Sequence, residues 1–497
     1  MYNFYLVDRE QQFLLPQNMM DWLPLDHFAR FVIELVAALD TAPFLAAYRT
    51  DGRGGAAYHP TMMTTLLVYA YCDGERSSRR IEERCQTDIA YRYITGGLTP
   101  DHCTISRFRD RHEKELAELF VPVLAICLRA GIGDTSFAAI DGTKLRCPAS
   151  LRANRKLASI EAELAAITEQ IETELARIVA EILTESHRAD LEDDRLPGMP
   201  DGPGREPGTL PDLPGLLPRA LHGKATRRAR LARAKQIMDD DWDAQRADHD
   251  AVLRARGERI RATGKGIPGP KPKPPTRDAE AKINVTDPDC RIMKDAHGGY
   301  LAGYNGQNTV SGDWVYLTSK VVNDENDTAQ LHPMMNATAD NLSAAGSPQA
   351  AGVYAADSGY RTHDAVAALD PDGPTVLLAP GKEHETRRHA NQQPTREGPP
   401  PPDATPAERI DWHLETTWGK QTYARRAATV EPGFGQIKHN RRITRFHRTG
   451  LTAVDSEWKL ITLTGNIRRL FRQTLTGTAH PTWSTLLQLT HPTPEPI

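Results

Sequence analysis

Two short apolar runs, each ending in an aspartate, constrain the fold of this chain more than any other feature. Residues 137–140 (FAAI) lead into Asp141 and a glycine, and residues 352–356 (GVYAA) lead into Asp357 and a Ser-Gly pair. Short apolar runs bounded by turn residues are typical of buried β-strands. We therefore expect two strands of one sheet, each with a carboxylate at its C-terminal edge. An aspartate before a glycine also commonly begins a turn, so neither residue alone indicates chemistry.

Other predicted strands and helices lie between and after these two runs. Residues 300–310 and 314–322 are joined by Ser-Gly-Asp, a typical hairpin signal, and residues 375–379 predict a fifth strand. Helices are expected near residues 326–341 and 362–369. The order of elements predicts an α/β fold built on a mixed five-stranded sheet.

A third acid, Glu431, lies in a strongly basic stretch. Residues 438–472 contain nine lysines and arginines and only two acids, although the whole chain has a formal net charge of −4. This local excess indicates one anion-binding region and not a uniformly basic protein. Glu431 is either an ion-pair partner of the arginines or a cation ligand beside a nucleic-acid backbone. In the second case the basic residues would neutralise charge during phosphodiester chemistry.

The cysteine and hydropathy patterns exclude several classes of protein. The six cysteines form no Cys-x-x-Cys pair and no Cys/His spacing, which argues against a zinc site and against a disulfide framework. No window approaches eighteen uncharged apolar residues, and the first residues lack a basic segment followed by an apolar one. We expect free thiols, no membrane span and a cytoplasmic protein.

Residues 1–134 predict a helical domain. An apolar run at 62–71 and a longer segment at 101–129, which lies between Pro100 and Gly131, carry the expected spacing and boundaries. Two short helices between these segments, followed by the longer one, resemble a helix-turn-helix arrangement that contacts DNA. A helical bundle with a solvated basic face is the alternative interpretation.

Residues 152–279 predict a helical hairpin inserted after the first strand. A second, basic helix is expected over 225–261, after a link rich in proline and glycine at 196–218 and before a breaker run at 264–275. The first helix has an apolar seam with alternating spacings of three and four residues, typical of a coiled coil: Leu157, Ile160, Leu164, Ile167 and Ile171. The hairpin is either a spacer or dimer contact, or a clamp on DNA.

Without the insertion, the predicted order of elements is that of a ribonuclease-H-like fold. In this arrangement the acids at Asp141 and Asp357 face each other across neighbouring strands, and a later helix adds Glu431. Three hard oxygen donors at one sheet edge favour Mg²⁺ or Mn²⁺ over zinc. Two such ions can activate a water or a sugar hydroxyl and stabilise the leaving oxygen of a phosphodiester.

These motifs resemble those of the DDE transposases of bacterial insertion sequences. IDGTK at 140–144, ADSGY at 356–360 and the tyrosine, arginine, glutamate and lysine between Tyr423 and Lys438 are similar to the three acidic motifs of that family. Each motif alone is weakly specific, but three in the right order are strongly so.

The resemblance extends beyond the acidic motifs. Residues 59–71 and 77–112 are similar to the N-terminal domain of that transposase group, and residues 282–310 to the segment that enters its hairpin strands. The resemblance covers roughly residues 1–155 and 280–472. It does not cover the core of the insertion or the last residues.

The resemblance implies roles for particular residues. Asp141, Asp357 and Glu431 would be the catalytic, metal-binding triad for two Mg²⁺ or Mn²⁺ ions. The expected DNA-binding residues are Tyr423, Arg426, Lys438, Arg441, Arg442 and Arg445. Arg426 departs from the family pattern, because it lies five residues before Glu431 where the family usually has four. Asn305 and Gln307 are either polar contacts of the site or satisfied sheet residues.

The resemblance also implies an activity and partners. The enzyme would cleave DNA at the ends of an insertion sequence and transfer the 3′-hydroxyl strand into target DNA. Its partners would be terminal inverted repeats, target DNA and a second copy of the chain in a homodimer. We expect a DNA-binding domain at 1–134, a catalytic domain at 135–151 and 280–475, the hairpin at 152–279 and a tail at 476–497. A nuclease or resolvase that does not join strands, and an inactive relic that only binds DNA, are the alternatives.

Overall fold

The computed structural model describes residues 18–51, 55–193, 221–264, 270–295, 298–347, 350–380 and 396–475. The chain divides into two compact units, Met1–Pro148 with Ile292–Ile497, and Ala149–Arg291. The expected link at 196–218, the tail at 476–497 and part of the breaker run at 264–275 lie outside the described residues. Among the helices of the described ranges, none has the length and apolar character needed to cross a membrane.

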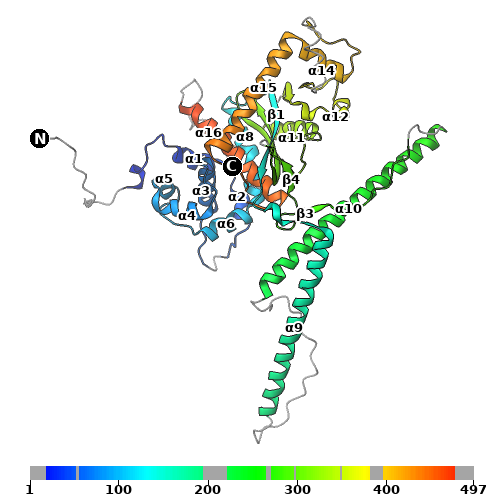
Figure 1. The fold of residues 1–497 in the computed structure, drawn as a ribbon. Helices are drawn as coiled ribbons and strands as arrows, with labels where there is room; N and C mark the ends of the chain where they lie inside the picture. Colours follow the sequence, from blue (N-terminus) through cyan, green and yellow to red (C-terminus); the bar gives the residue numbers. More distant parts are fainter. Residues whose placement is uncertain are drawn as a thin grey trace, which may run out of the picture. The chain divides into compact units, whose positions relative to one another are not determined.

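The first unit contains a mixed six-stranded sheet in the order β4-β5-β1-β7-β8, with β6 also paired to β5 (Figure 1). Its strands are β1 (Ala138–Arg146), β4 (Arg291–Lys294), β5 (Tyr300–Ser311), β6 (Tyr316–Val322), β7 (Val353–Ala356) and β8 (Thr375–Leu378). All five predicted strands are present. The predicted number is wrong by one, because the four residues of β4 mix arginine and lysine with two apolar residues and carry no clear strand pattern.

Four strands of this sheet, β1, β6, β7 and β8, run in the same direction. β1 is parallel to β7 and antiparallel to β5, and β5 is antiparallel to β6. The C-terminal ends of β1, β6 and β7 therefore meet at the same edge of the sheet. β1 is longer than predicted, so Asp141 lies inside the strand and not at its end. The pairing of β1 with β7 stops at Ala139, so Asp141 lies two residues beyond the part of β1 that is paired with β7.

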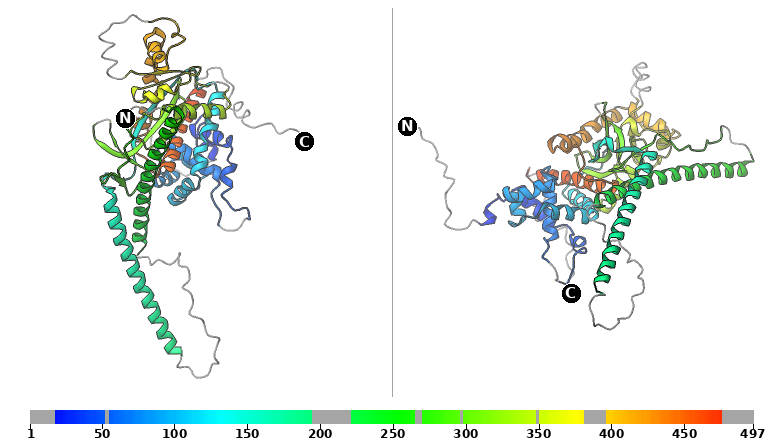
Figure 2. Two further views of the ribbon diagram at one scale, coloured as in Figure 1. Left: turned by 90° about the vertical axis from the view of Figure 1, so that its right-hand side faces the viewer. Right: turned by 60° about the horizontal axis from the view of Figure 1, so that its bottom comes forward.

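The helices that follow the strands are α11 (Leu331–Ala344), α12 (His363–Ala367), α14 (Pro406–Glu415), α15 (Thr417–Gly435) and α16 (Leu451–Leu475). The last helix is buried on most of its faces, which is typical of a helix inside a protein. It packs against β6 and against four N-terminal helices (Figures 1 and 2). Trp458 is fully buried within this contact, and a methyl group on Gly306 would lie 2.8 Å from its indole ring.

The N-terminal part of the first unit is helical, as expected. Its helices are α1 (Phe28–Ala37), α2 (Ala42–Leu45), α3 (Pro60–Cys72), α4 (Ser78–Thr87), α5 (Ile89–Ile94), α6 (His102–Arg111), α7 (Glu113–Glu118) and α8 (Phe120–Arg129). The helix expected over 101–129 is broken into three. It is interrupted at His112, where the backbone leaves helical geometry (φ −108°, ψ 33°), and again at Leu119. Arg76 is buried and pairs with the buried Glu457 of α16 at 2.6 Å, so this arginine is not available to DNA.

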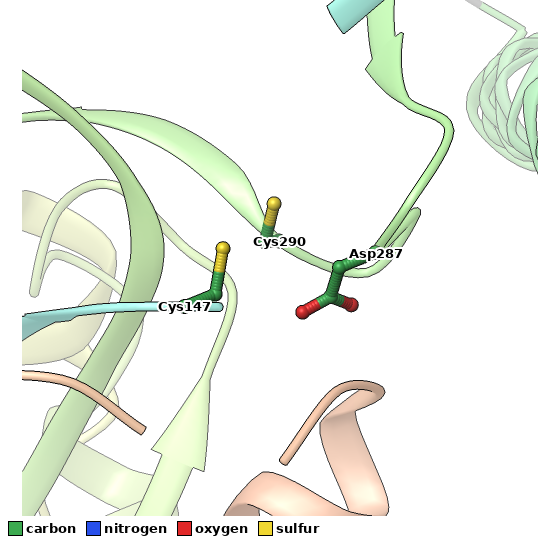
Figure 3. Close-up of side chains that lie close together, drawn as sticks. All are labelled: Cys147, Asp287 and Cys290. Carbon is green, nitrogen blue, oxygen red and sulfur yellow. The ribbon is translucent and has the colours of Figure 1, made fainter. Parts of the chain in front are cut away.

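The second unit contains the two predicted long helices, α9 (Leu157–Asp193) and α10 (His222–Thr263), and a small sheet of β2 (Asn154–Lys156) and β3 (Lys282–Asn284). The seam residue Ile160 packs with Leu231, Ala234, Ile283 and Val285 in a buried cluster, and Leu164 and Ile167 extend it. Between β3 and β4 the backbone N–H of Cys290 donates to the Asp287 carbonyl oxygen at 3.2 Å. Figure 3 shows the side chains of these two buried residues. No disulfide joins any of the six cysteines, all of which lie within the described ranges.

Candidate active site

Asp357 directly follows the last residue of β7, and Asp141 lies on β1 two residues beyond the last residue that pairs with β7. The Gly142 N–H donates to Asp141 Oδ1 at 2.8 Å, and the Gly359 N–H donates to Asp357 Oδ1 at 2.8 Å. Each carboxylate is thus oriented by the backbone that follows it. The N–H groups of Gly142 and Gly359 therefore help to orient the two aspartates.

The two carboxylates influence each other electrically. The pKa of Asp141 is raised to about 6, chiefly by burial; Arg426 lowers it and the charge of Asp357 raises it. Burial disfavours an ionised carboxyl group, and a second negative charge adds to the effect. Perturbed pKa values of this kind cluster at functional sites.

Arg426 is brought directly to Asp141 by α15. Its Nη1 donates to Asp141 Oδ2 at 3.0 Å, and both side chains are less than one-fifth exposed. One turn earlier on the same helix, the Tyr423 hydroxyl donates to the carbonyl oxygen of Ala356, next to Asp357, at 3.3 Å. The arginine whose spacing departs from the family pattern is therefore the one in contact with the first acid.

Glu431 is on the same helix but is exposed, and it forms no hydrogen bond or ion pair within the described ranges. It lies five residues after Arg426, which is about 140° around a helix axis. Pro432 follows it inside the helix and has no N–H to donate to the carbonyl of Ala428. That carbonyl instead accepts from the indole of Trp314 at 3.0 Å. The structure does not bring Glu431 into contact with Asp141 or Asp357.

The basic residues after α15 differ in their accessibility. A π-helical turn at Gln436–Asn440 carries Lys438, whose Nζ donates to the Lys144 carbonyl oxygen of β1 at 3.2 Å; burial lowers the pKa of this lysine. Arg442 and Arg445 are exposed. Arg441 is only 6% exposed, and its Nη1 donates to the Ile461 carbonyl oxygen and to Thr464 of α16. Arg441 therefore has a structural role that leaves it little access to DNA.

The structure adds a carboxylate that the sequence patterns did not single out. Asp327, in the loop after β6, accepts hydrogen bonds from Asn305 Nδ2 at 2.7 Å and from Gln307 Nε2 at 2.5 Å. Gln307 Oε1 in turn accepts from the hydroxyl of the buried Tyr360. The signal available in the sequence was positional: Asp327 follows a hairpin strand that runs parallel to the strand of Asp141.

The oxygen donors at this edge suit a hard divalent cation. Within the described ranges, Asp357 Oδ2 accepts no hydrogen bond, and Asp141 and Asp357 present carboxylate oxygens at the same edge of the sheet. Mg²⁺ and Mn²⁺ prefer such oxygen ligands. A bound cation would also relieve the repulsion that raises the pKa of Asp141.

Two family models match the chain. One, described as a transposase domain (DUF772), matches residues 17–111, and the other, described as a transposase DDE domain, matches residues 402–471. The second match contains α14, α15 and most of α16, whereas Asp141 and Asp357 lie outside both. No curated protein and no solved structure matches the chain. The two matches confirm the resemblance to insertion-sequence DDE transposases and support a DNA-processing function.

Proposed function

We propose that this protein is a metal-dependent DNA transposase with a ribonuclease-H-like catalytic core. It would cleave DNA at the ends of an insertion sequence and transfer the resulting 3′-hydroxyl strand into target DNA. Asp141, Asp357 and Glu431 would be its catalytic, metal-binding residues. The terminal inverted repeats and target DNA would be its substrates.

One observation carries this proposal. The helix of the matched DDE domain, α15, places Arg426 on Asp141 at 3.0 Å, at the sheet edge where Asp357 also lies. The helix that bears Glu431 is therefore packed against the strands that bear the other two acids. This supports the assignment of all three residues to a single site.

Asp141 and Asp357 would hold the divalent cations, with Glu431 as the third ligand. Bound Mg²⁺ or Mn²⁺ supplies Lewis-acid activation of the attacking oxygen and stabilises the leaving oxygen. Asp141 and Asp357 are already oriented for this by the backbone N–H groups of Gly142 and Gly359. Glu431 is exposed and makes no competing contact, so it is free to join the site when DNA and cations bind.

The basic side chains would bind and neutralise the DNA. Arg426 carries its charge to within hydrogen-bonding distance of Asp141, where a scissile phosphate must lie for attack. Lys438 lies beside β1, and Arg442 and Arg445 present exposed charges for phosphates farther along the strand. Arg441 is buried and is therefore not part of the proposed DNA-binding surface.

Two DNA ends have to be cleaved and joined, which requires two copies of the site. We therefore propose a homodimer in the DNA complex. Residues 1–134 and the basic segment after α15 would bind the inverted repeats. The 152–279 hairpin would serve as a spacer or dimer contact, or as a clamp on DNA. Light scattering of the protein with and without DNA ends measures the stoichiometry directly.

A plasmid assay tests the activity. The donor is a supercoiled plasmid that carries the inverted repeats found beside this reading frame, and the reaction contains Mg²⁺ or Mn²⁺. We expect cleavage at the ends and strand-transfer products that run as larger species. Cleavage without any joined product would indicate a nuclease or resolvase instead.

Alanine variants separate the enzyme from a relic that only binds DNA. Asp141→Ala, Asp357→Ala and Glu431→Ala should each abolish cleavage while binding the repeats as the wild type does. A wild-type protein as inert as these three variants would contradict the transposase proposal and favour the relic.

A further inference from the structure

Asp327 lies at the same sheet edge as the two aspartates of the proposed site. β6 runs parallel to β1 and β7 in direction, and Asp327 follows the last residue of β6 by five positions. Acids that follow strands of one direction gather at one edge of the sheet. The loop after β6 thus brings a third carboxylate to the edge of Asp141 and Asp357.

Hydrogen bonds tie Asp327 into the interior of the sheet. Asn305 and Gln307, which donate to it, are 1% and 0% exposed. Gln307 Oε1 accepts from the hydroxyl of Tyr360, the last residue of the turn that begins at Asp357. A continuous chain of hydrogen bonds therefore runs from Asp327 through Gln307 to the second acidic motif.

The two glycines of the acidic motifs both lie against Asp327. A methyl group on Gly142 would lie 2.7 Å from Asp327 Oδ1, closer than any real side-chain contact. A methyl group on Gly359 would lie 3.0 Å from Asp357 Oδ1 and 3.8 Å from Asp327 Oδ2. One oxygen of Asp327 thus faces the strand of Asp141, and the other faces the turn of Asp357.

An unpartnered buried amide oxygen lies in the same place. Asn305 Oδ1 has no hydrogen-bond partner, and it lies 2.8 Å from where a methyl group on Gly142 would be. A buried oxygen without a partner is unfavourable and requires an explanation. It lies beside the strand of Asp141, next to the Nδ2 group through which Asn305 donates to Asp327.

We propose that Asp327 is a positioning residue of the cation site, an inference that rests on the proposed function. It holds the Asp141 strand and the Asp357 turn in their mutual arrangement, through Gln307 and Tyr360 on one side and beside Gly142 on the other. Asp327 strengthens the binding of a divalent cation by fixing its ligands and by adding a negative charge close to them. An acid that merely ends the loop after β6 would have neither effect.

Mn²⁺ binding tests this without any need for DNA. The free metal ion is followed by electron paramagnetic resonance during titration of the full chain and of three variants, Asp327→Ala, Asp327→Asn and Asp340→Ala. Asp340 is exposed on α11 and makes no side-chain contact, which makes it a matched control. We expect Asp327→Ala to weaken Mn²⁺ binding by about 10–100-fold, the usual effect of losing a group that orients metal ligands.

The other variants separate positioning from general damage to the fold. Both amides donate to Oδ1 of Asp327, so Asp327→Asn can keep an accepting oxygen for both while it loses the negative charge, and it should recover part of the affinity. Asp340→Ala should bind as the wild type does. Tyr360→Phe removes the far end of the chain of hydrogen bonds. Combined with Asp327→Ala it should weaken binding no further than Asp327→Ala alone, because both act through Gln307.

The outcomes for Asp327 and for the transposase proposal are distinct. Equal Mn²⁺ affinities of Asp327→Ala and wild-type protein would overturn the inference, even if neither protein cleaves DNA. An Asp327→Ala protein that cleaves donor DNA at the wild-type rate and metal concentration, beside an inert Asp141→Ala protein, would overturn it while leaving the transposase intact. A wild-type protein that binds no Mn²⁺ would overturn both.

Discussion

Asp141 and Glu431 are proposed to hold the same cations, yet they differ in burial and in hydrogen-bond partners. Asp141 is half-buried, is oriented by the Gly142 N–H and is paired with Arg426 at 3.0 Å. Glu431 is exposed on α15 and contacts no partner within the described ranges. A half-buried carboxylate has to be compensated in the metal-free protein, whereas an exposed one is stabilised by water. We therefore propose a site with a fixed half at Asp141 and Asp357 and a second half, Glu431, that joins it when cations and DNA bind.

Arg426 links the two acids, because it pairs with Asp141 and is on the same helix as Glu431. In the metal-free protein its guanidinium supplies the positive charge that Asp141 needs. Because Arg426 and Glu431 are on the same helix, a small rotation or shift of α15 can alter both contacts together. The predictions below test whether the fixed half and the mobile half of the site work together.

The largest expected effect is the loss of cleavage in Asp141→Ala and in Glu431→Ala. Each should reduce the cleavage rate by about 10³-fold or more, because both groups act on charge that develops in the transition state. The rates are measured on donor plasmid, with Asp340→Ala as the control. If Glu431→Ala cleaved at the wild-type rate, the exposed acid would have no part in the site.

Arg426→Ala should have the next largest effect. Removal of the guanidinium leaves Asp141 without its partner and takes one cation from the phosphate, so cleavage should fall by about 10–100-fold. Lys420→Ala, an exposed change on the same helix, should have little effect. An Arg426→Ala protein with the wild-type rate would show that the pairing with Asp141 belongs only to the resting state.

The stability of the metal-free protein should depend on pH through Asp141. Its pKa is raised from 3.8 to about 6, so the folded protein holds this proton more tightly than the unfolded chain. Protonated Asp141 therefore contributes about 3 kcal/mol to the free energy of unfolding. This contribution is fully present below about pH 4 and is lost as the pH rises through about 6. Urea unfolding of wild type and Asp141→Asn measures this. The Asn variant should lack this component, and identical pH profiles for the two proteins would contradict it.

The smallest expected effect concerns two glycines. Gly142→Ala places a methyl group against Gln307, Asn305 and Asp327, and should reduce the free energy of unfolding by about 1–3 kcal/mol. Gly435→Ala, at the end of α15, meets nothing within 4 Å and should add about 0.5–1 kcal/mol. Thermal unfolding followed by circular dichroism measures both. Equal changes in the two variants would mean that the space beside Gly142 is not constrained.

The sequence was informative where a pattern was local. The apolar runs before Asp141 and Asp357 predicted β1 and β7, and the Ser-Gly-Asp turn predicted the hairpin of β5 and β6. The strand β4 was missed because four mixed residues carry no period. The break at His112 was missed because the apolar spacing continues across it while the backbone does not.

Local sequence patterns did not predict contacts between residues that are far apart in the sequence. The departure of Arg426 from the usual spacing counted against it, yet helix geometry brings it to Asp141, 285 residues earlier in the sequence. Arg441 was grouped with the basic residues because of its charge, but α16 buries it. Asp327 lies among other acids at the start of the helix expected near 326–341, which in the structure begins only at Leu331, and only the pairing of β1, β5 and β6 shows which edge it reaches.

Crystals of the protein bound to DNA ends and soaked in Mn²⁺ would show, through the anomalous scattering of the metal, whether the three acids form one site. We expect an anomalous peak in contact with the carboxylates of Asp141, Asp357 and Glu431, with α15 shifted from the position described above. A peak held by Asp141 and Asp357 without Glu431, or no peak at this edge of the sheet, would contradict this expectation.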